Sequence, residues 1–198
     1  GYHDPEDHSV PGYFEMPIAR GESIVFTASL DARDPATLKP LIADEIEAHD
    51  PRDSFYHTLV NAAHQFRQQL GGLDYIIAGY PWFKPRARDT FIAMPGLTLA
   101  IGETEQFEKY MDTAALALDD FMGGRPVSVQ IYETEQPDTL LWAMWCLQQY
   151  AKYVGRERCR ERYGALIARI MSVIFAGRHP SLFGHTNGLV YANGRDRA

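Results

Sequence analysis

The sequence of 198 residues has little of what several classes of protein require. It holds only two cysteines, Cys146 and Cys159, and their spacing fits neither a CxxC pair nor a zinc motif. Two such thiols are typical of reduced cysteines in a cytoplasmic protein, and a secreted protein with few cysteines is the alternative. Because no run of about 18 apolar residues is present, the sequence predicts no transmembrane helix.

An excess of positive charge is also missing. The chain has 19 lysine and arginine residues against 26 aspartate and glutamate residues, which gives a net charge of −7. Nucleic acids and anionic membranes both require a basic face, so neither is expected to be the main partner. The sequence contains no GxGxxG, P-loop, GxSxG or HExxH motif, and His57 and His64 have no obvious third ligand. We therefore expect no metal and no cofactor.

What the sequence does contain is enough apolar residues, 45% of the total, to bury a sizeable core. Asp34 followed by Pro35 is a helix start, and Gly71-Gly72 and Gly123-Gly124 are expected helix ends. The expected helices cover residues 34–46, 53–70, 103–122, 137–154 and 156–176, and one more begins near Asp89. Helical hairpins with short links are typical of bundles, solenoids and helical toroids.

Two stretches outside the helices have the character of strands. Residues 12–18 and 23–28 flank a turn at Arg20–Glu22 and predict an N-terminal β-hairpin. Near the end of the chain, Gly188–Tyr191 predicts one short strand. The fold is therefore expected to be mainly α, with a small amount of β structure at its start.

Residues 75–91 form the densest unusual segment. A short apolar strand runs into an aromatic and proline-containing turn, a basic run, and an aspartate near the start of a helix. Aromatic rings beside Arg88 and Asp89 suit a sugar, because ring faces stack on C–H patches while charged planar groups bond the hydroxyls. The plainer interpretation, which composition alone favours, makes Asp89 a first-turn acid and Trp82 a core residue.

A second candidate lies at the start of a later helix. Asp138 is well placed to cap that helix, and Trp142 lies one turn further on the same face. An aspartate and a tryptophan at a helix start suit a polyol ligand, and they suit a cap and a core residue equally well.

Several of these segments resemble one known family. The stretches Ile77–Phe83, Arg88–Ala93 and Pro95–Leu97 look like the signature of the C-terminal amylo-α-1,6-glucosidase domain of glycogen debranching enzymes of the bacterial and archaeal type. Pro11–Glu15, Asp138–Trp142 and Gly188–Tyr191 resemble further parts of such proteins, in the same order.

The resemblance implies a fold, an activity and a set of site residues. Residues 1–32 would be the end of a preceding β domain or a linker, and residues 33–198 the N-terminal half of an (α/α)6 toroid. The family hydrolyses α-1,6-linked glucose at the branch stubs of a glycogen limit dextrin, with inversion. Asp89 carries over as the general acid. The residues that carry over as sugar contacts are Tyr80, Trp82, Arg88, Asp138 and Trp142.

The resemblance also has departures and alternatives. Arg86-Ala87, preceded by Lys84-Pro85, stands where many members have Trp-Gly before the Arg-Asp pair, and the family's general base, a late glutamate, is expected beyond Ala198. The 198-residue piece is therefore expected to be inactive by itself, and to self-associate through exposed apolar helix faces. A non-catalytic helical interaction or carbohydrate-binding module is one alternative, and another (α/α)6 α-glucan hydrolase, such as a trehalase or glucoamylase relative, is the other.

Overall fold

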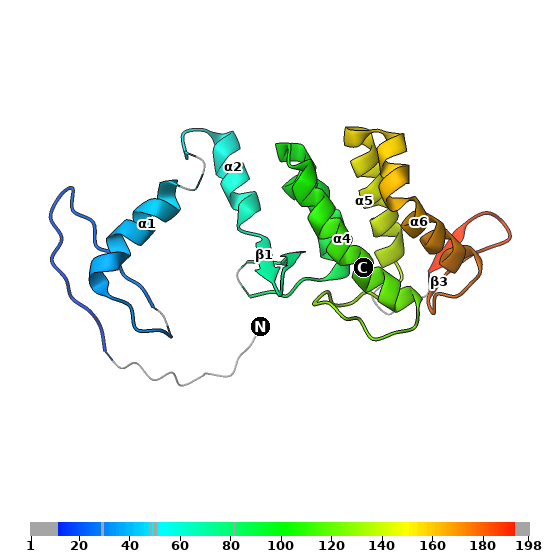
Figure 1. Ribbon diagram of the computed structural model, residues 1–198. Helices are drawn as coiled ribbons and strands as arrows, with labels where there is room; N and C mark the ends of the chain where they lie inside the picture. Colours follow the sequence, from blue (N-terminus) through cyan, green and yellow to red (C-terminus); the bar gives the residue numbers. More distant parts are fainter. Residues whose placement is uncertain (1–11, 29, 48, 50, 81, 193–198) are drawn as a thin grey trace. The chain divides into compact units, whose positions relative to one another are not determined.

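The computed structural model describes residues 12–28, 30–47, 49, 51–80 and 82–192, and it is mainly helical, as predicted (Figure 1). The helices are α1 (Leu38–Glu47), α2 (Phe55–His64), α3 (Ala87–Leu97), α4 (Thr104–Met122), α5 (Thr139–Val154) and α6 (Arg156–Phe175). The strands are β1 (Arg67–Leu70), β2 (Leu73–Ile76), β3 (Leu182–Gly184) and β4 (Val190–Ala192). Pro11 and Pro81, which belong to two of the family-like segments, lie outside the described residues.

The chain divides into two units, residues 1–49 and residues 50–198, which are described here one at a time. In the first unit the helix start at Asp34 is confirmed, because its side chain accepts a hydrogen bond of 2.9 Å from the Ala36 N–H and α1 follows one 3-10 turn later. The apolar side chains of α1 are largely exposed. The predicted self-association and the predicted domain boundary at residue 32 stay predictions.

The predicted N-terminal β-hairpin is wrong for the described residues, since 12–28 contain no strand. The expected turn is present: the Glu22 N–H donates to the Ala19 carbonyl at 3.0 Å, and the rings of Phe14 and Phe26 lie 5.3 Å apart. Both rings are exposed, so the segment packs on no core within its unit. A hairpin with no surface to cover is only marginally stable, which explains the missing ladder.

The second unit begins with a helix that is shorter than predicted. Ser54 caps α2 by accepting from the His57 N–H at 3.1 Å, but the helix ends at His64 instead of continuing to Gly71-Gly72. Strands β1 and β2 form an antiparallel hairpin around these two glycines, whose φ angles are 59° and 78°. Positive φ at both positions is the requirement of a two-residue type I′ turn, so Gly71-Gly72 is a hairpin turn and not a helix end.

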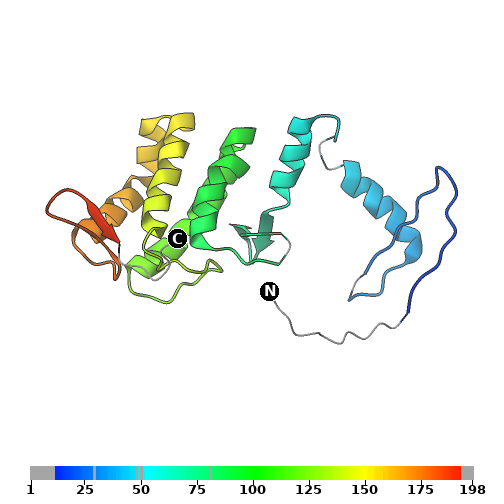
Figure 2. The same cartoon turned by 180° about the vertical axis from the view of Figure 1, so that it is seen from behind.

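The core of this unit lies among α3, α4, α5 and α6, which stand together in both views (Figures 1 and 2). Helix α5 packs on α3 and α6, and α4 contacts α3 and α6. The predicted apolar stripe of α4 is confirmed, with Phe107 and Met111 fully buried and the Phe107 ring stacked on Tyr150 at 4.7 Å. The predicted last strand corresponds to β4, which pairs with β3.

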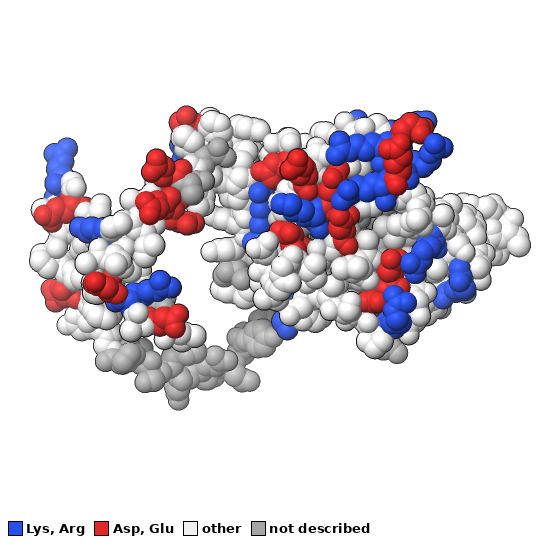
Figure 3. Space-filling model, in the orientation of Figure 1, with Lys and Arg blue, Asp and Glu red and all other residues white. Residues whose placement is uncertain are grey.

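Ion pairs link α6 to α4 on one side of this core. Figure 3 shows basic and acidic side chains interspersed over this part of the surface. The Arg158 guanidinium lies 2.8 Å from the Glu108 carboxylate, and Arg162 lies 2.5 Å from Asp112. Tyr150 also donates a hydrogen bond to Glu108. Arg158 and Arg162 of α6 thus bind the neighbouring helix α4.

No helix of the described residues has the length and apolar character that a membrane crossing requires. In the same part of the chain, no three His, Cys, Asp or Glu side chains come together in a way that would hold a metal ion.

Candidate functional site

The aromatic part of the 75–91 segment is a tight exposed loop that follows β2. The Phe83 N–H donates to the Gly79 carbonyl at 3.0 Å, and a Cβ on Gly79 would lie 2.8 Å from the Phe83 ring, so any larger residue there would displace this ring. Tyr80 is 61% exposed and Trp82 is 78% exposed. The interpretation of Trp82 as a core residue is therefore wrong.

The basic run that follows is attached to the segment before α5. The Tyr132 N–H donates to the Pro85 carbonyl at 3.0 Å, and the Ala87 N–H donates to the Tyr132 carbonyl at 2.9 Å. The Lys84 ammonium lies 5.0 Å from the centre of the Tyr132 ring. These contacts bring the start of α3 next to the start of α5, although about 50 residues separate them in the sequence.

Arg86, which stands where many members of the resembled family have tryptophan, has an acidic partner here. Its Nε lies 3.5 Å from Oε1 of Glu133. Glu133 has a φ of 60°, an uncommon conformation for a residue with a side chain. Sequence reasoning missed this pairing, because nothing local in either segment indicates that they are neighbours.

Arg88, Asp138 and Trp142 form one hydrogen-bonded group, called here the Asp138 cluster. The Arg88 Nη2 donates to Oδ1 of Asp138 at 3.0 Å, and its Nε lies 2.9 Å from Oδ2. The Trp142 Nε1–H donates to the same Oδ2 at 3.1 Å. Asp138 occupies the N-cap position of α5, as predicted, but its side chain makes no cap hydrogen bond, so capping does not account for this carboxylate.

Asp89 lies in the first turn of α3, as the sequence predicts, and its side chain is half-buried. Within the described part of the chain its carboxylate has no hydrogen-bond or ion-pair partner. No such bond joins Tyr80 or Trp82 to the Asp138 cluster either, among the residues described. The site thus combines a held carboxylate, a carboxylate without a partner and two exposed aromatic rings.

These features define a helical protein with acidic, basic and indole side chains gathered where two helices begin. A comparison with models of protein families matches residues 62–196 to amylo-alpha-1,6-glucosidase. The match covers more than half of the chain and includes every candidate site residue, so the chain belongs to the amylo-alpha-1,6-glucosidase family. Neither the curated proteins nor the solved structures give a match.

Proposed function

We propose that this chain takes part in the hydrolysis of α-1,6-linked glucose at the branch stubs of glycogen, with Asp89 as the general acid. Membership of the family supports a glucosidase-related domain that acts on a glucan. The observation that carries the proposal is the contrast between the two aspartates, since Asp138 is held by two side chains while Asp89 has no partner among the described residues.

The Asp138 cluster is proposed to hold the glucose that is released. The carboxylate accepts from sugar hydroxyls and the Arg88 guanidinium donates to them, and each group holds the other in a fixed orientation. The Trp142 indole is half-buried, and its ring is proposed to contact C–H groups of the sugar. Trp82 and Tyr80 are proposed to contact the glucan chain from the exposed loop.

Inversion requires two carboxyl groups roughly 6.5–9.5 Å apart on opposite sides of the bond that breaks. Asp89 gives its proton to the leaving O6 of the glucan as the C1–O6 bond breaks, and a water molecule attacks C1 from the other face. The second carboxylate takes the proton from this water, and the product is β-glucose.

The second carboxylate is not supplied by the acidic residues that contact this site. Both oxygens of Asp138 are bound by Arg88 and Trp142, and Glu133 is paired with Arg86. A carboxylate that is already held by donors or by a cation is poorly placed to take a proton from water. We therefore propose that the base comes from another part of the enzyme, and that the 198-residue chain releases no glucose alone.

The architecture proposed for the parent domain is an (α/α)6 toroid. In the described part of unit 50–198, helices α3 to α6 share one core, and α5 and α6 are joined through Gly155 alone as a helical hairpin, which supports this architecture. Cys146 and Cys159 are buried free thiols, and this supports a reducing, cytoplasmic location.

A second candidate function is non-catalytic carbohydrate binding. The exposure of Trp82 and Tyr80 favours it, because a binding module presents aromatic rings on its surface. The two functions differ in their need for Asp89, which binding alone does not require.

The test is calorimetric titration of the chain with an oligosaccharide that carries one α-1,6-linked glucose. We expect binding that is lost in Arg88→Ala and kept in Asp89→Asn. Equal binding by the native chain and Arg88→Ala would contradict the proposed sugar site. Release of glucose by the 198-residue chain, abolished by Asp89→Asn, would contradict the assignment of the base to another part of the enzyme.

A further inference from the structure

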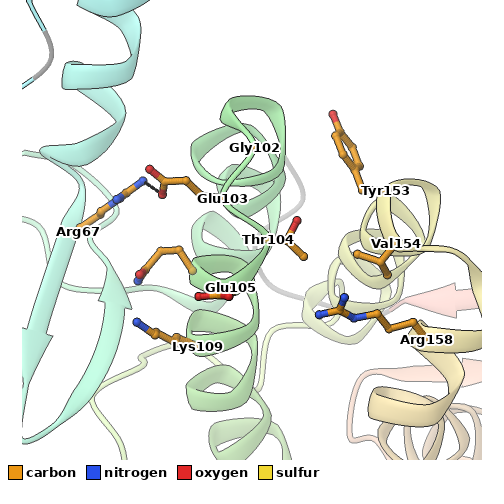
Figure 4. A pocket seen from close by; sticks show the side chains of 10 residues that line it. Arg67, Gly102, Glu103, Thr104, Glu105, Lys109, Tyr153, Val154 and Arg158 are labelled. Carbon is orange, nitrogen blue, oxygen red and sulfur yellow. Dashed lines mark hydrogen bonds and ion pairs between the residues drawn. The ribbon is translucent and has the colours of Figure 1, made fainter.

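A polar cavity of about 840 Å³ lies away from the candidate site, over the first turns of α4 (Figure 4). Its walls come from β1, the start of α4, the end of α5 and the start of α6. The residues that matter for its chemistry are Arg67, Glu103, Glu105, Lys109, Tyr153 and Arg158. The volume falls within the range of about 300–1,000 Å³ of small-molecule sites.

The cavity and the Asp138 cluster lie at opposite ends of α5. Asp138 precedes the first residue of this helix, whereas Tyr153 and Val154 are its last two. A helix of 16 residues spans roughly 24 Å. The cavity is therefore separate from the site proposed for the reaction.

Two of the cations in the cavity are held in place by carboxylate partners, Arg67 by Glu103 and Arg158 by Glu108. Arg67 is ion-paired with Glu103, which also lies 3.0 Å from the His64 Nε2, and Arg67 donates to the Leu97 carbonyl. Figure 4 shows Arg67 and Arg158 reaching toward α4 from opposite sides. Side chains held in this way lose little further freedom when a ligand binds.

The mixture of charges indicates what kind of ligand fits. Arg67, Lys109 and Arg158 would attract an anion, but Glu103 and Glu105 in the same cavity would repel it. A cationic ligand would be attracted by the two glutamates and repelled by the three basic side chains. A neutral polyhydroxyl compound suits both kinds of group, because each hydroxyl donates to carboxylates and accepts from cations.

Tyr153 adds the apolar contact that a sugar also needs. Its side chain is 59% exposed at the rim of the cavity, so its ring is open to C–H groups. We propose that this cavity is a second, non-catalytic site for an α-glucan segment. The choice of a glucan among polyhydroxyl compounds rests on the proposed function.

A second site has a physical use for an enzyme that acts on a branched polymer. When one glucan molecule binds in the cavity, the effective concentration of its branch stubs at the Asp138 cluster rises. The gain requires no new contact at the reacting bond.

The test uses the 198-residue chain in affinity electrophoresis through gels that contain glycogen, and in titration with maltoheptaose. Tyr153→Ala is expected to weaken binding about fivefold, the loss expected for one stacked ring. Lys109→Ala is expected to weaken it less. The matched control is Tyr56→Ala, because Tyr56 is a helical tyrosine with 55% exposure outside the cavity.

Arg88→Ala separates this inference from the proposed function. If Tyr153→Ala weakens the binding of maltoheptaose and Tyr56→Ala does not, the second site is supported. Unchanged binding in both Tyr153→Ala and Lys109→Ala overturns the second site, and the response of Arg88→Ala to the branched ligand then judges the proposed function independently. Displacement of maltoheptaose by inorganic phosphate would also overturn the proposal, since it would show an anion site.

Discussion

Helices α3 and α5 begin next to one another, each with an aspartate at its start, and the two aspartates are held differently. Asp138 has the helix cap position, yet its carboxylate turns to Arg88 and Trp142. Asp89, in the first turn of α3, has no such partner in the described part of the chain. The difference assigns distinct roles: a fixed carboxylate positions a ligand, and a carboxylate without a partner is available for proton transfer.

Replacing each aspartate by asparagine is the strongest test of whether the two residues have different roles. We expect Asp138→Asn to lower the free energy of unfolding by about 2 kcal/mol, because the half-buried Arg88 loses its charged partner. Asp89→Asn is expected to change it by less than about 1 kcal/mol, the usual effect of a first-turn acid. Urea unfolding of both variants measures this, and equal losses would remove the distinction between the two residues.

Trp142→Phe tests the indole hydrogen bond within the Asp138 cluster. The variant keeps a ring but loses the N–H that donates to Asp138, so we expect a loss of about 1 kcal/mol in stability. Trp145→Phe is the matched control, since Trp145 lies on the same helix with its ring 5.5 Å from that of Trp142. Thermal unfolding of the pair should separate them, and similar melting temperatures would show that the indole N–H contributes nothing.

Trp82→Ala examines the exposed loop. Because the side chain is 78% exposed, we expect a stability change within about 0.5 kcal/mol together with about fivefold weaker binding of the branched oligosaccharide. Phe55→Ala removes an equally exposed ring from α2 and should leave binding unchanged. A large loss of stability in Trp82→Ala, or no loss of binding, would refute a role in contacting the glucan.

The smallest expected effect on stability concerns a third carboxylate, Glu108. Like Asp138, it accepts hydrogen bonds from an arginine and from an aromatic side chain, here Arg158 and Tyr150. Burial acts to raise the pKa of Glu108, but hydrogen bonds from Tyr150 and Arg158 outweigh it and lower that pKa below its usual value. A carboxylate with a lowered pKa stabilises the fold above its unfolded-state pKa, and this contribution is lost as the pH falls through the folded-state value.

Glu108→Gln should therefore reduce the loss of stability between neutral pH and about pH 4 and below. Urea unfolding over this range, for the native chain and the variant, measures the difference. Identical pH profiles would mean that the α4–α6 contacts do not depend on the charge of Glu108.

The sequence predicted the local parts of the fold and site well. The stripe of α4, the cap at Asp34 and the one-turn spacing of Asp138 and Trp142 depend on neighbouring residues and are confirmed. The Arg88–Asp138 pair could not be predicted from the sequence, because it joins residues 50 positions apart through the packing of α3 on α5.

Two errors came from signals that suit more than one structure. Gly71-Gly72 ends helices and also makes type I′ turns, and the choice depended on whether residues 67–70 pair with 73–76. The strand-like residues 12–28 have the composition of a hairpin but no core to cover within their unit. In both places the local sequence was compatible with two structures, and tertiary packing determined which of them formed.

The most direct test of the account is the rate of glucose release by a full-length enzyme containing this chain, with Asp89→Asn and two substrates. On a branched dextrin, whose leaving oxygen needs a proton, we predict a loss of about 10²–10⁴-fold. On α-glucosyl fluoride, whose leaving group needs no acid, the variant should keep most of its activity. Unchanged release from the dextrin, or equal losses on both substrates, would contradict Asp89 as the general acid.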